Sequence, residues 1–305
     1  MSQLTDTVVM ISPDQFGFNP ETAGTNAFQH KVDIKQSEIQ KKAMNEFTGM
    51  VSQLKSKGIN VITLKSRDDV VTPDAVFPNN WFSSHEGGKI VLYPMLAPNR
   101  RTERQPEALQ KALLQSKIAV SEFIDLTEEE NNSGVLEGTG SLVLDRVNKI
   151  AYAMESPRTT KLTFDKWCNK LGYQGIFFHA YDKHNLPIYH TNVVMSIGEE
   201  FTVICLESIK DQAEKELLVK KFKKTGKKII LISLKQAYSF CGNILQLKTQ
   251  EGKKIVVLSR LALDAFTPDQ KAQLEKFGEL VPVDIQMIEK VEGGSARCML
   301  AEIFR

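Results

Sequence analysis

Short apolar runs occur in pairs along the chain, and each pair encloses a turn that contains glycine, asparagine or lysine. Short β-rich runs on both sides of turn residues are typical of β-hairpins. The pattern therefore predicts four hairpins of similar construction: Asn80–Ser84 with Ile90–Tyr93, Gly140–Leu144 with Ile150–Tyr152, Asn192–Ser196 with Phe201–Ile204, and Asn243–Leu247 with Ile255–Leu258.

A fifth copy of the first run, Cys298–Ala301, has no second run after it. We expect its partner strand to be the apolar segment Val8–Ile11. The five first runs begin at residues 80, 140, 192, 243 and 298, and these are called the anchor positions below. A period of this length is typical of repeat architectures.

Helical patterns lie between the hairpins, and a further apolar strand follows several of them. Apolar residues recur at helical spacing over residues 38–57 and 208–225, and a glycine ends each pattern. Residues 267–270 combine an N-cap threonine, a proline and a capping-box glutamine, which begin a third helix. The following strands are predicted at Val61–Leu64, Gly175–Phe178, Ile229–Ile232 and Leu280–Val283.

The repeating unit is thus a hairpin, a helix and a strand, used about five times. One such unit cannot bury its apolar faces alone, and a closed ring of five units around a central axis solves this problem. We therefore predict an α/β fold in the form of a five-bladed, pseudo-symmetric α/β propeller. Because no linker rich in proline, glycine or serine divides the chain, we expect a single domain over residues 1–305. Two stacked α/β domains are the alternative.

Composition and charge narrow the class of partner. The chain has 39 basic and 37 acidic residues and a net charge of +2, which argues against nucleic acid as the main partner. The lysines between 220 and 228 are interpreted as the solvated end of a helix. No apolar run is long enough to cross a membrane, and the N-terminal residues do not resemble a signal peptide. The four cysteines lack CxxC spacing, so we expect a cytoplasmic protein with reduced thiols.

A ring of repeats brings its equivalent positions together near the axis. The residues at or just before the anchor positions include Cys298, His190 and Glu137. A thiol, an imidazole and a carboxylate are the groups needed for a nucleophile, a proton-transfer base and a group that orients the base. Each residue also has a purely structural explanation: Cys298 as a small buried hydrophobe, His190 as a core histidine and Glu137 as a solvated acid. His179 and His184 compete with His190 but are not at an anchor position, and His30 and His85 are interpreted as surface or loop residues.

Three motifs together resemble a known superfamily: Leu136–Gly140, His190–Val193 and Gly293–Cys298. They are similar to motifs of the guanidino-group-modifying enzymes, namely the arginine deiminases, the dimethylarginine dimethylaminohydrolases and the amidinotransferases, which share the pentein fold. Pro73–Phe82 and Phe16–Pro20 resemble more closely the branch called citrulline-utilisation hydrolases or amidinotransferase-like proteins. The resemblance covers nearly the whole chain.

The resemblance implies roles for individual residues. Cys298 matches the family nucleophile, His190 the histidine that shuttles protons, and Glu137 the acid of the family's glycine-containing motif. Relatives have acidic groups where this chain has neutral Gly140 and Asn192. They also have an acidic pair that binds the guanidinium where this chain has Asn79 and Asn80. The predicted substrate-binding set is Asn79, Asn80, Asp74, Asn192, Asn243 and Arg297, of which Asp74 restores one charge and Arg297 would bind a substrate carboxylate.

The implied activity is hydrolysis of a C–N bond in an arginine-like guanidino or ureido substrate, through a covalent thiouronium on the cysteine, with release of ammonia or an amine. An amidinotransferase that passes the amidino group to an acceptor amine is one alternative, and a non-catalytic pentein binding protein is another. A papain-like thiol hydrolase has its cysteine early and its histidine late, the reverse of the order here. No metal or organic cofactor, nucleic acid or membrane is expected as a partner, and a homo-oligomer is left open.

Overall fold

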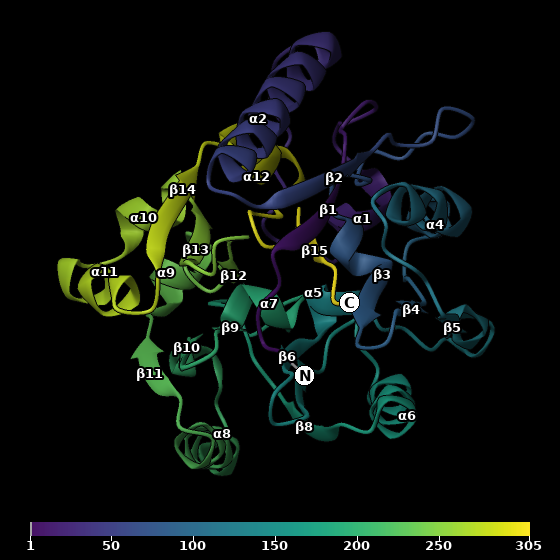
Figure 1. Cartoon of the computed structure of the whole chain (residues 1–305). Helices are drawn as coiled ribbons and strands as arrows, with labels where there is room; N and C mark the ends of the chain where they lie inside the picture. Colours follow the sequence, from purple (N-terminus) through teal and green to yellow (C-terminus); the bar gives the residue numbers. More distant parts are fainter. Residues whose placement is uncertain (1) are drawn as a thin grey trace.

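The computed structural model describes residues 2–305. Five sheets of three strands surround a central axis, and the longer helices lie on the outside of the ring (Figure 1). In each sheet the first two strands are antiparallel, and the third pairs in parallel with the second. The predicted five-module α/β ring is therefore confirmed.

The sheets follow the order of the modules. They are β15 (Ala301–Glu302), β1 (Thr7–Ile11) and β2 (Asn60–Leu64); β3 (Phe82–His85), β4 (Lys89–Leu92) and β5 (Glu122–Asp125); β6 (Val143–Asp145), β7 (Ile150–Met154) and β8 (Gln174–Phe178); β9 (Met195–Ile197), β10 (Phe201–Ile204) and β11 (Lys228–Leu231); and β12 (Leu245–Lys248), β13 (Lys254–Ser259) and β14 (Glu279–Val283).

The ring closes as the sequence predicts. The C-terminal strand β15 pairs antiparallel with the N-terminal strand β1, so that Val8 faces Glu302 and Val9 faces Ala301. First strands of neighbouring modules contact each other around the axis, as β15 does with β3 and β9 does with β6 and β12. The apolar faces of neighbouring modules therefore pack together, in four clusters that each span more than one module.

The parallel third strand of each module requires a crossover connection, and a helix supplies it. These helices are α2 (Gln36–Ser56), α4 (Pro106–Gln115), α6 (Lys161–Leu171), α8 (Gln212–Lys224) and α11 (Pro268–Glu275). The predictions for residues 38–57 and 208–225 and for a capped helix at Thr267 are confirmed, and Thr267 does form a capping box with Gln270. The helices α4 and α6 and the strand β5 were not predicted.

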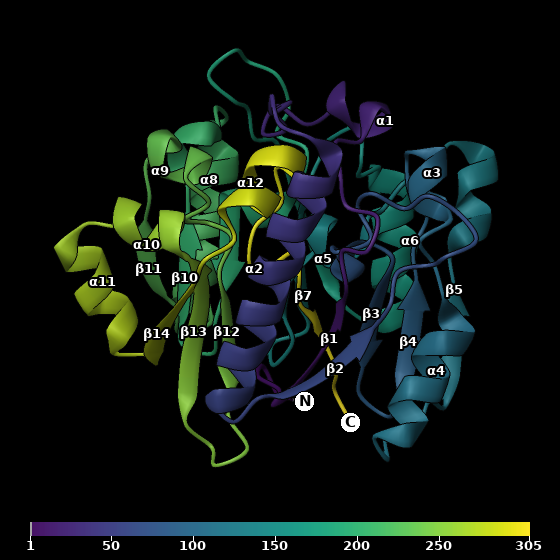
Figure 2. The ribbon, with the colours of Figure 1, turned by 90° about the horizontal axis from the view of Figure 1, so that it is seen from above.

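Shorter helices complete the chain: α1 (Pro20–Ala23), α3 (Pro98–Arg101), α5 (Gly138–Ser141), α7 (Thr191–Val194), α9 (Leu234–Tyr238), α10 (Arg260–Ala265) and α12 (Gln286–Glu292), with 3₁₀ turns η1 (Pro78–Asn80), η2 (Thr127–Asn132) and η3 (Leu206–Ser208). In Figure 2, α1 lies at one end of the ring and both termini lie toward the other. The anchor positions do not begin strands: Asn80, Gly140 and Asn192 lie in short helical turns before the first strands. These turns point polar groups toward the axis.

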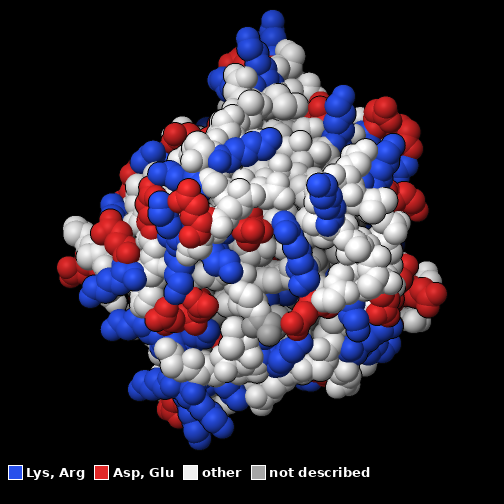
Figure 3. All heavy atoms as spheres, in the orientation of Figure 1, with Lys and Arg blue, Asp and Glu red and all other residues white. Residues whose placement is uncertain are grey.

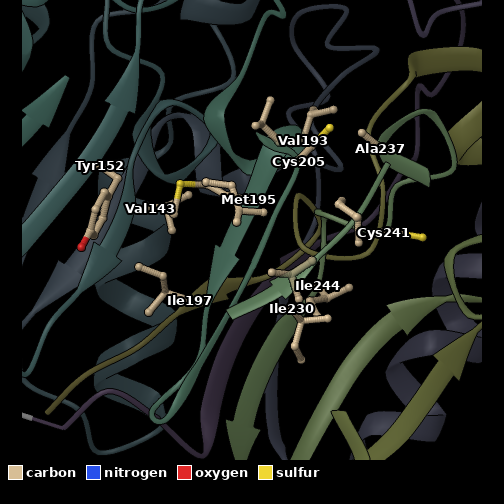
Figure 4. Packing of buried hydrophobic residues seen from close by; sticks show 14 of the residues in the cluster. Val143, Tyr152, Val193, Met195, Ile197, Cys205, Ile230, Ala237, Cys241 and Ile244 are labelled. Atoms are coloured by element: carbon tan, nitrogen blue, oxygen red, sulfur yellow. The ribbon is translucent and has the colours of Figure 1, made fainter. Parts of the chain in front are cut away.

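The apolar core crosses the boundaries between modules. Figure 4 shows part of it, where Val143 and Tyr152 of the third module lie near Met195 and Ile197 of the fourth, and Ile244 comes from the fifth. Charged side chains of both signs are interspersed over the face drawn in Figure 3. Among residues 2–305, no helix combines the length and apolar character that a membrane span needs. Location in the cytoplasm stays a prediction.

Two polar residues expected on the surface are buried. Lys227 lies inside the protein, where its Nζ is 3.3 Å from Asp145 Oδ2 and donates to the carbonyl oxygen of Glu199 at 2.8 Å. His85 is buried in β3 and bonds the hydroxyl of Ser83. A single polar residue in a strand or after a helix has no pattern that separates a buried, paired position from a solvated one.

Candidate active site

A small polar hollow lies beside the nucleophile candidate. Four of the predicted site residues line it, namely Cys298, His190, Asn80 and Asp74. The other lining residues come from several modules: Thr22, Asn26, Phe77, Arg100, Arg158, Tyr189, Glu292 and Gly294. The ring therefore brings together side chains that are far apart in the sequence.

Two glycines allow the chain to reach Cys298. Gly293 ends α12 in the left-handed region with φ of +65°, and a Cβ there would lie 2.6 Å from the backbone of Phe28. A Cβ on Gly294 would lie 2.6 Å from the Phe77 ring. The turn that follows is held by a hydrogen bond from the backbone N–H of Cys298 to Ser295 O, and the thiol is almost completely buried.

His190 and Glu137 form a buried hydrogen-bonded pair. The Nε2 of His190 is 2.9 Å from Glu137 Oε2, and the other carboxylate oxygen accepts from the backbone N–H of Leu96. Burial raises the pKa of Glu137, but the charge of Arg158, the bond from His190 and the charge of Arg100 outweigh it and lower the pKa to about 2. Because this carboxylate is ionised and can only accept, Nε2 carries the proton and Nδ1 is left with a free lone pair.

The imidazole is neutral near pH 7. Burial lowers the pKa of His190 to about 4, although the bond to Glu137 favours the charged form, and the charges of Arg158 and Arg100 act in the same direction as burial. A neutral imidazole beside an ionised carboxylate is the protonation state of a base that is ready to accept a proton.

Gly140 allows the His190–Glu137 pair to approach Asn80. A Cβ at residue 140 would lie 2.5 Å from Asn80 Nδ2 and 2.7 Å from Nδ1 and Cε1 of His190. No side chain fits there without displacing the imidazole. The absence of the second acid of the family motif therefore has a steric reason in this chain.

A carboxyl pair, Asp74 and Glu292, lies in the same hollow. One oxygen of Asp74 accepts from Asn19 Nδ2 at 2.8 Å and lies 3.3 Å from Nε of Arg100, whereas Oδ1 has no partner among residues 2–305. Burial, followed by the charge of Asp74, raises the pKa of Glu292 well above its usual value. Glu292 accepts from the backbone N–H of Asn19 and from Gln29 Nε2, which ties the N-terminal segment over the hollow.

The two arginines of the hollow were not predicted. Arg100 is fully engaged inside the protein, since it bonds Asn80 Oδ1 and makes a bidentate pair with Glu103. Arg158 bonds Thr22 O and Thr25 Oγ1 and lies 3.6 Å from Glu137. Neither arginine nor Glu292 lies at an anchor position, so the repeat pattern offered no signal for them. Arg100, Asn80, Asp74 and Glu137 form one connected network.

The remaining predicted site residues lie elsewhere. Asn79 is buried next to Asn80, whose Nδ2 donates to Asn79 Oδ1, but it does not line the hollow. Asn192 and Asn243 do not line it either and instead contact the sulfur of Cys298. Arg297 bonds Leu300 O and Glu302 Oε2 and does not line the hollow, and its binding of a substrate carboxylate stays a prediction.

The competing histidines are outside the site. His179 is 43% exposed in its side chain and lies between Glu155 and Glu214, and His184 is exposed. Within residues 2–305, no group of three or more histidine, cysteine, aspartate and glutamate side chains is arranged to hold a metal ion.

A family model described as N,N dimethylarginine dimethylhydrolase, eukaryotic, matches residues 12–305. The chain belongs to this family. The resemblance to the guanidino-modifying superfamily is therefore confirmed, whereas the closer branch stays a prediction. No curated protein matches the chain.

Solved structures share the fold across nearly the whole chain. Apo ArgZ, an arginine dihydrolase from the ornithine-ammonia cycle in Cyanobacteria, is 16% identical with a TM-score of 0.73. The match covers 97% of this chain and 40% of the ArgZ chain. Unliganded AgrE is 17% identical with a TM-score of 0.74, at 98% and 40% coverage. A cysteine-to-serine mutant of DDAH from Pseudomonas aeruginosa with citrulline is 15% identical with a TM-score of 0.65, at 98% of both chains.

The chain thus spans about two fifths of the length of ArgZ and AgrE, but it covers 98% of the separate N-terminal domain of ArgZ bound to substrate. At these identities the likeness establishes the fold, which is the five-module ring of the pentein enzymes.

Proposed function

We propose that this chain is an amidine hydrolase in which Cys298 attacks the carbon of an arginine-like guanidino or ureido group. The observation that supports this most is that Cys298 and His190 border one buried hollow while His190 is bonded to an ionised Glu137. Nucleophile, base and orienting acid are the parts of nucleophilic catalysis. We further propose that residues 1–305 act as one catalytic domain, since the site takes residues from several modules.

The first half of the reaction forms a covalent intermediate. Cys298 Sγ gives its proton to Nδ1 of His190 and bonds to the guanidino carbon, which becomes tetrahedral. A C–N bond then breaks, and the leaving nitrogen takes the proton from Nδ1 and departs as ammonia or an amine. The product on the enzyme is a thiouronium, and the ionised Glu137 stabilises the imidazolium that exists between the two transfers.

The second half restores the enzyme. Water gives a proton to Nδ1 of His190 and bonds to the thiouronium carbon. The C–S bond then breaks, the proton on Nδ1 returns to the sulfur, and the hydroxyl proton of the adduct passes to solvent as the neutral ureido product leaves. Every proton that His190 accepts is returned within one turnover.

The walls of the hollow suit an amino acid with a cationic end. The guanidinium of Arg158 is a partner for the substrate carboxylate, because its planar fork matches a carboxylate. The carboxyl group of Asp74 is a partner for an N–H group of the substrate. Near the reacting carbon this chain has Asn80, where relatives have an acidic residue. The amide of an asparagine can accept from guanidino N–H groups and can also donate to a ureido oxygen.

Relatives support this class of substrate. ArgZ is described as an arginine dihydrolase, and its N-terminal domain has been solved covalently bound to a reaction intermediate. The DDAH of Pseudomonas aeruginosa is solved with citrulline. These compounds share an amino acid with a guanidino or ureido end.

A panel of guanidino and ureido compounds tests the proposal, with ammonia, amine and ureido products measured. We expect at least one member to be hydrolysed by the wild type and by Cys168→Ser, a matched change of another buried cysteine. Cys298→Ser should stay folded and lose hydrolysis. Full activity of Cys298→Ser would remove the covalent mechanism.

The amidinotransferase alternative is tested in the same assay by adding acceptor amines. Hydrolysis predicts that ammonia or amine release does not depend on the acceptor. A product that contains the acceptor amine, formed at the expense of the ureido product, would assign transfer instead. Absence of any conversion across the panel would favour the non-catalytic alternative.

A further inference from the structure

Two asparagine side chains from neighbouring modules point N–H groups at the sulfur of Cys298. The Nδ2 atom of Asn243 is 3.3 Å from Sγ, and that of Asn192 is 3.5 Å from it. The amide oxygens are farther away, at 3.7 Å for Asn243 and 3.9 Å for Asn192. Both amides are buried.

The orientation of each amide is fixed by its other partners. Asn243 Nδ2 donates to the backbone oxygen of Asn192, and its Oδ1 accepts from the backbone N–H of Arg297. Asn192 Nδ2 donates to the backbone oxygen of Thr139. A carbonyl oxygen can only accept, so neither amide can be reversed without losing a bond. The second N–H of each amide is therefore left for the sulfur.

We propose that Asn192 and Asn243 form an amide pair that stabilises the thiolate of Cys298, so that they act on the nucleophile rather than on the substrate. This rests on the proposed function, in which Cys298 attacks as a thiolate. A thiolate accepts both N–H donors at 3.3 and 3.5 Å, and its charge strengthens these bonds, whereas a thiol can donate only to the more distant amide oxygens. The pair thus lowers the cost of removing that proton.

The other charged groups near Cys298 do not replace this pair. His190 is neutral near pH 7. Arg297 is bonded to Glu302, and Arg100 is bonded to Glu103. The titratable and charged groups that face the sulfur or line its hollow are His190, Tyr189, Arg297, Arg100, Arg158, Asp74 and Glu292. The three arginines outnumber the two carboxyl groups of this set, but Arg297 and Arg100 are each bonded to a glutamate outside it, Glu302 and Glu103.

The same geometry accounts for an amide rather than an acid at residue 192. An aspartate there would keep the shape of the side chain but would place a carboxylate within about 4 Å of the sulfur. It would also lose the N–H donor. Asn192→Asp and Asn243→Asp are therefore near-isosteric variants that invert the effect of the pair.

Ionisation of Cys298 is measured without any substrate. The thiolate absorbance is titrated with pH, and the Cys298→Ser spectrum is subtracted at each pH. In parallel, iodoacetamide forms an S–C bond with release of iodide, and the rate at Cys298 is read by peptide mass. Loss of one donor in Asn192→Ala or Asn243→Ala should raise the midpoint relative to the wild type by about one pH unit, which is a tenfold lower thiolate fraction.

Asn148→Ala, which removes an amide from the β6–β7 turn, is the control and should leave the midpoint unchanged. Asn192→Asp and Asn243→Asp should raise it more than the alanine variants. Since the two positions are tested separately, one variant that fails to fold leaves the other informative. Asparagine variants that titrate like the wild type would overturn the inference. A perturbed thiol without turnover of any panel compound would instead contradict the proposed function alone.

Discussion

Gly140→Ala adds one methyl group between the imidazole of His190 and the amide of Asn80. The new Cβ would lie 2.7 Å from Nδ1 and Cε1 of His190, which is 0.7 Å short of the 3.4 Å at which ordinary contacts begin. It would lie 2.5 Å from Asn80 Nδ2. These neighbours are themselves held, His190 by Glu137 and Asn80 by Arg100. The imidazole of His190 or the turn of α5 must therefore move.

The expected cost has two parts. Overpacking of a close-packed interior destabilises by about 1–3 kcal/mol. A catalytic group displaced by nearly 1 Å loses on the order of 100-fold in rate. We therefore expect Gly140→Ala to fold with reduced stability and to lose about 100-fold in kcat on the best panel substrate, since Nδ1 is the atom that moves the proton.

The assay compares kcat, KM and urea unfolding in parallel with a control. Gly49→Ala in the exposed face of α2 meets nothing within 4 Å. It should leave turnover unchanged and raise stability by about 0.5–1 kcal/mol, because alanine is the better helix former. A Gly140→Ala variant with wild-type stability and turnover within about threefold of wild type would refute the close approach of residue 140 to His190.

Three further outcomes follow from buried polar groups. His190→Ala should lower turnover by about 10²- to 10⁴-fold, and a loss below about tenfold would contradict its proposed role in proton transfer. Burial raises the pKa of Glu289 to about 7. Its contribution to the free energy of unfolding is therefore complete below about pH 4.5, and about 3 kcal/mol is lost as the pH rises through 7. Glu289→Gln should therefore lose less stability than wild type between about pH 5 and 8 in urea unfolding, and equal losses would contradict the shift. Lys227→Met should destabilise by about 3 kcal/mol, because it leaves Asp145 buried without its cation, whereas a similar change at exposed Lys220 should cost under about 0.5 kcal/mol.

The repeat in the sequence was enough to predict the ring. Hairpins are local, and glycine-containing turns between β-rich runs mark them directly, so all four were located. The pairing of Val8–Ile11 with the C-terminal run needed the closure argument, because nothing local connects them. The helices α4 and α6 were missed because their apolar faces are short and the segments before them resemble loops.

The site was predicted in part, for a related reason. Cys298, His190 and Glu137 lie at or near anchor positions, so symmetry brought them together. Arg100 and Arg158 enter the hollow from the β4–β5 and β7–β8 connections inside their modules, and Glu292 enters from α12 between β14 and β15. The repeat says nothing about the direction of side chains in these connections. The role of an amide such as Asn192 depends on which of its two ends faces the sulfur, and only the positions of its neighbours determine that.

Mass analysis of the Cys298 peptide, after acid quench of a reaction with the compound that is turned over, tests the central claim most directly. The account predicts an adduct on Cys298 whose mass is that of the substrate minus the ammonia or amine that has left. The adduct should form in the wild type and should live longer in His190→Ala. The three other cysteines should stay unmodified. Turnover with Cys298 unmodified throughout, or an adduct on Cys241 instead, would contradict it.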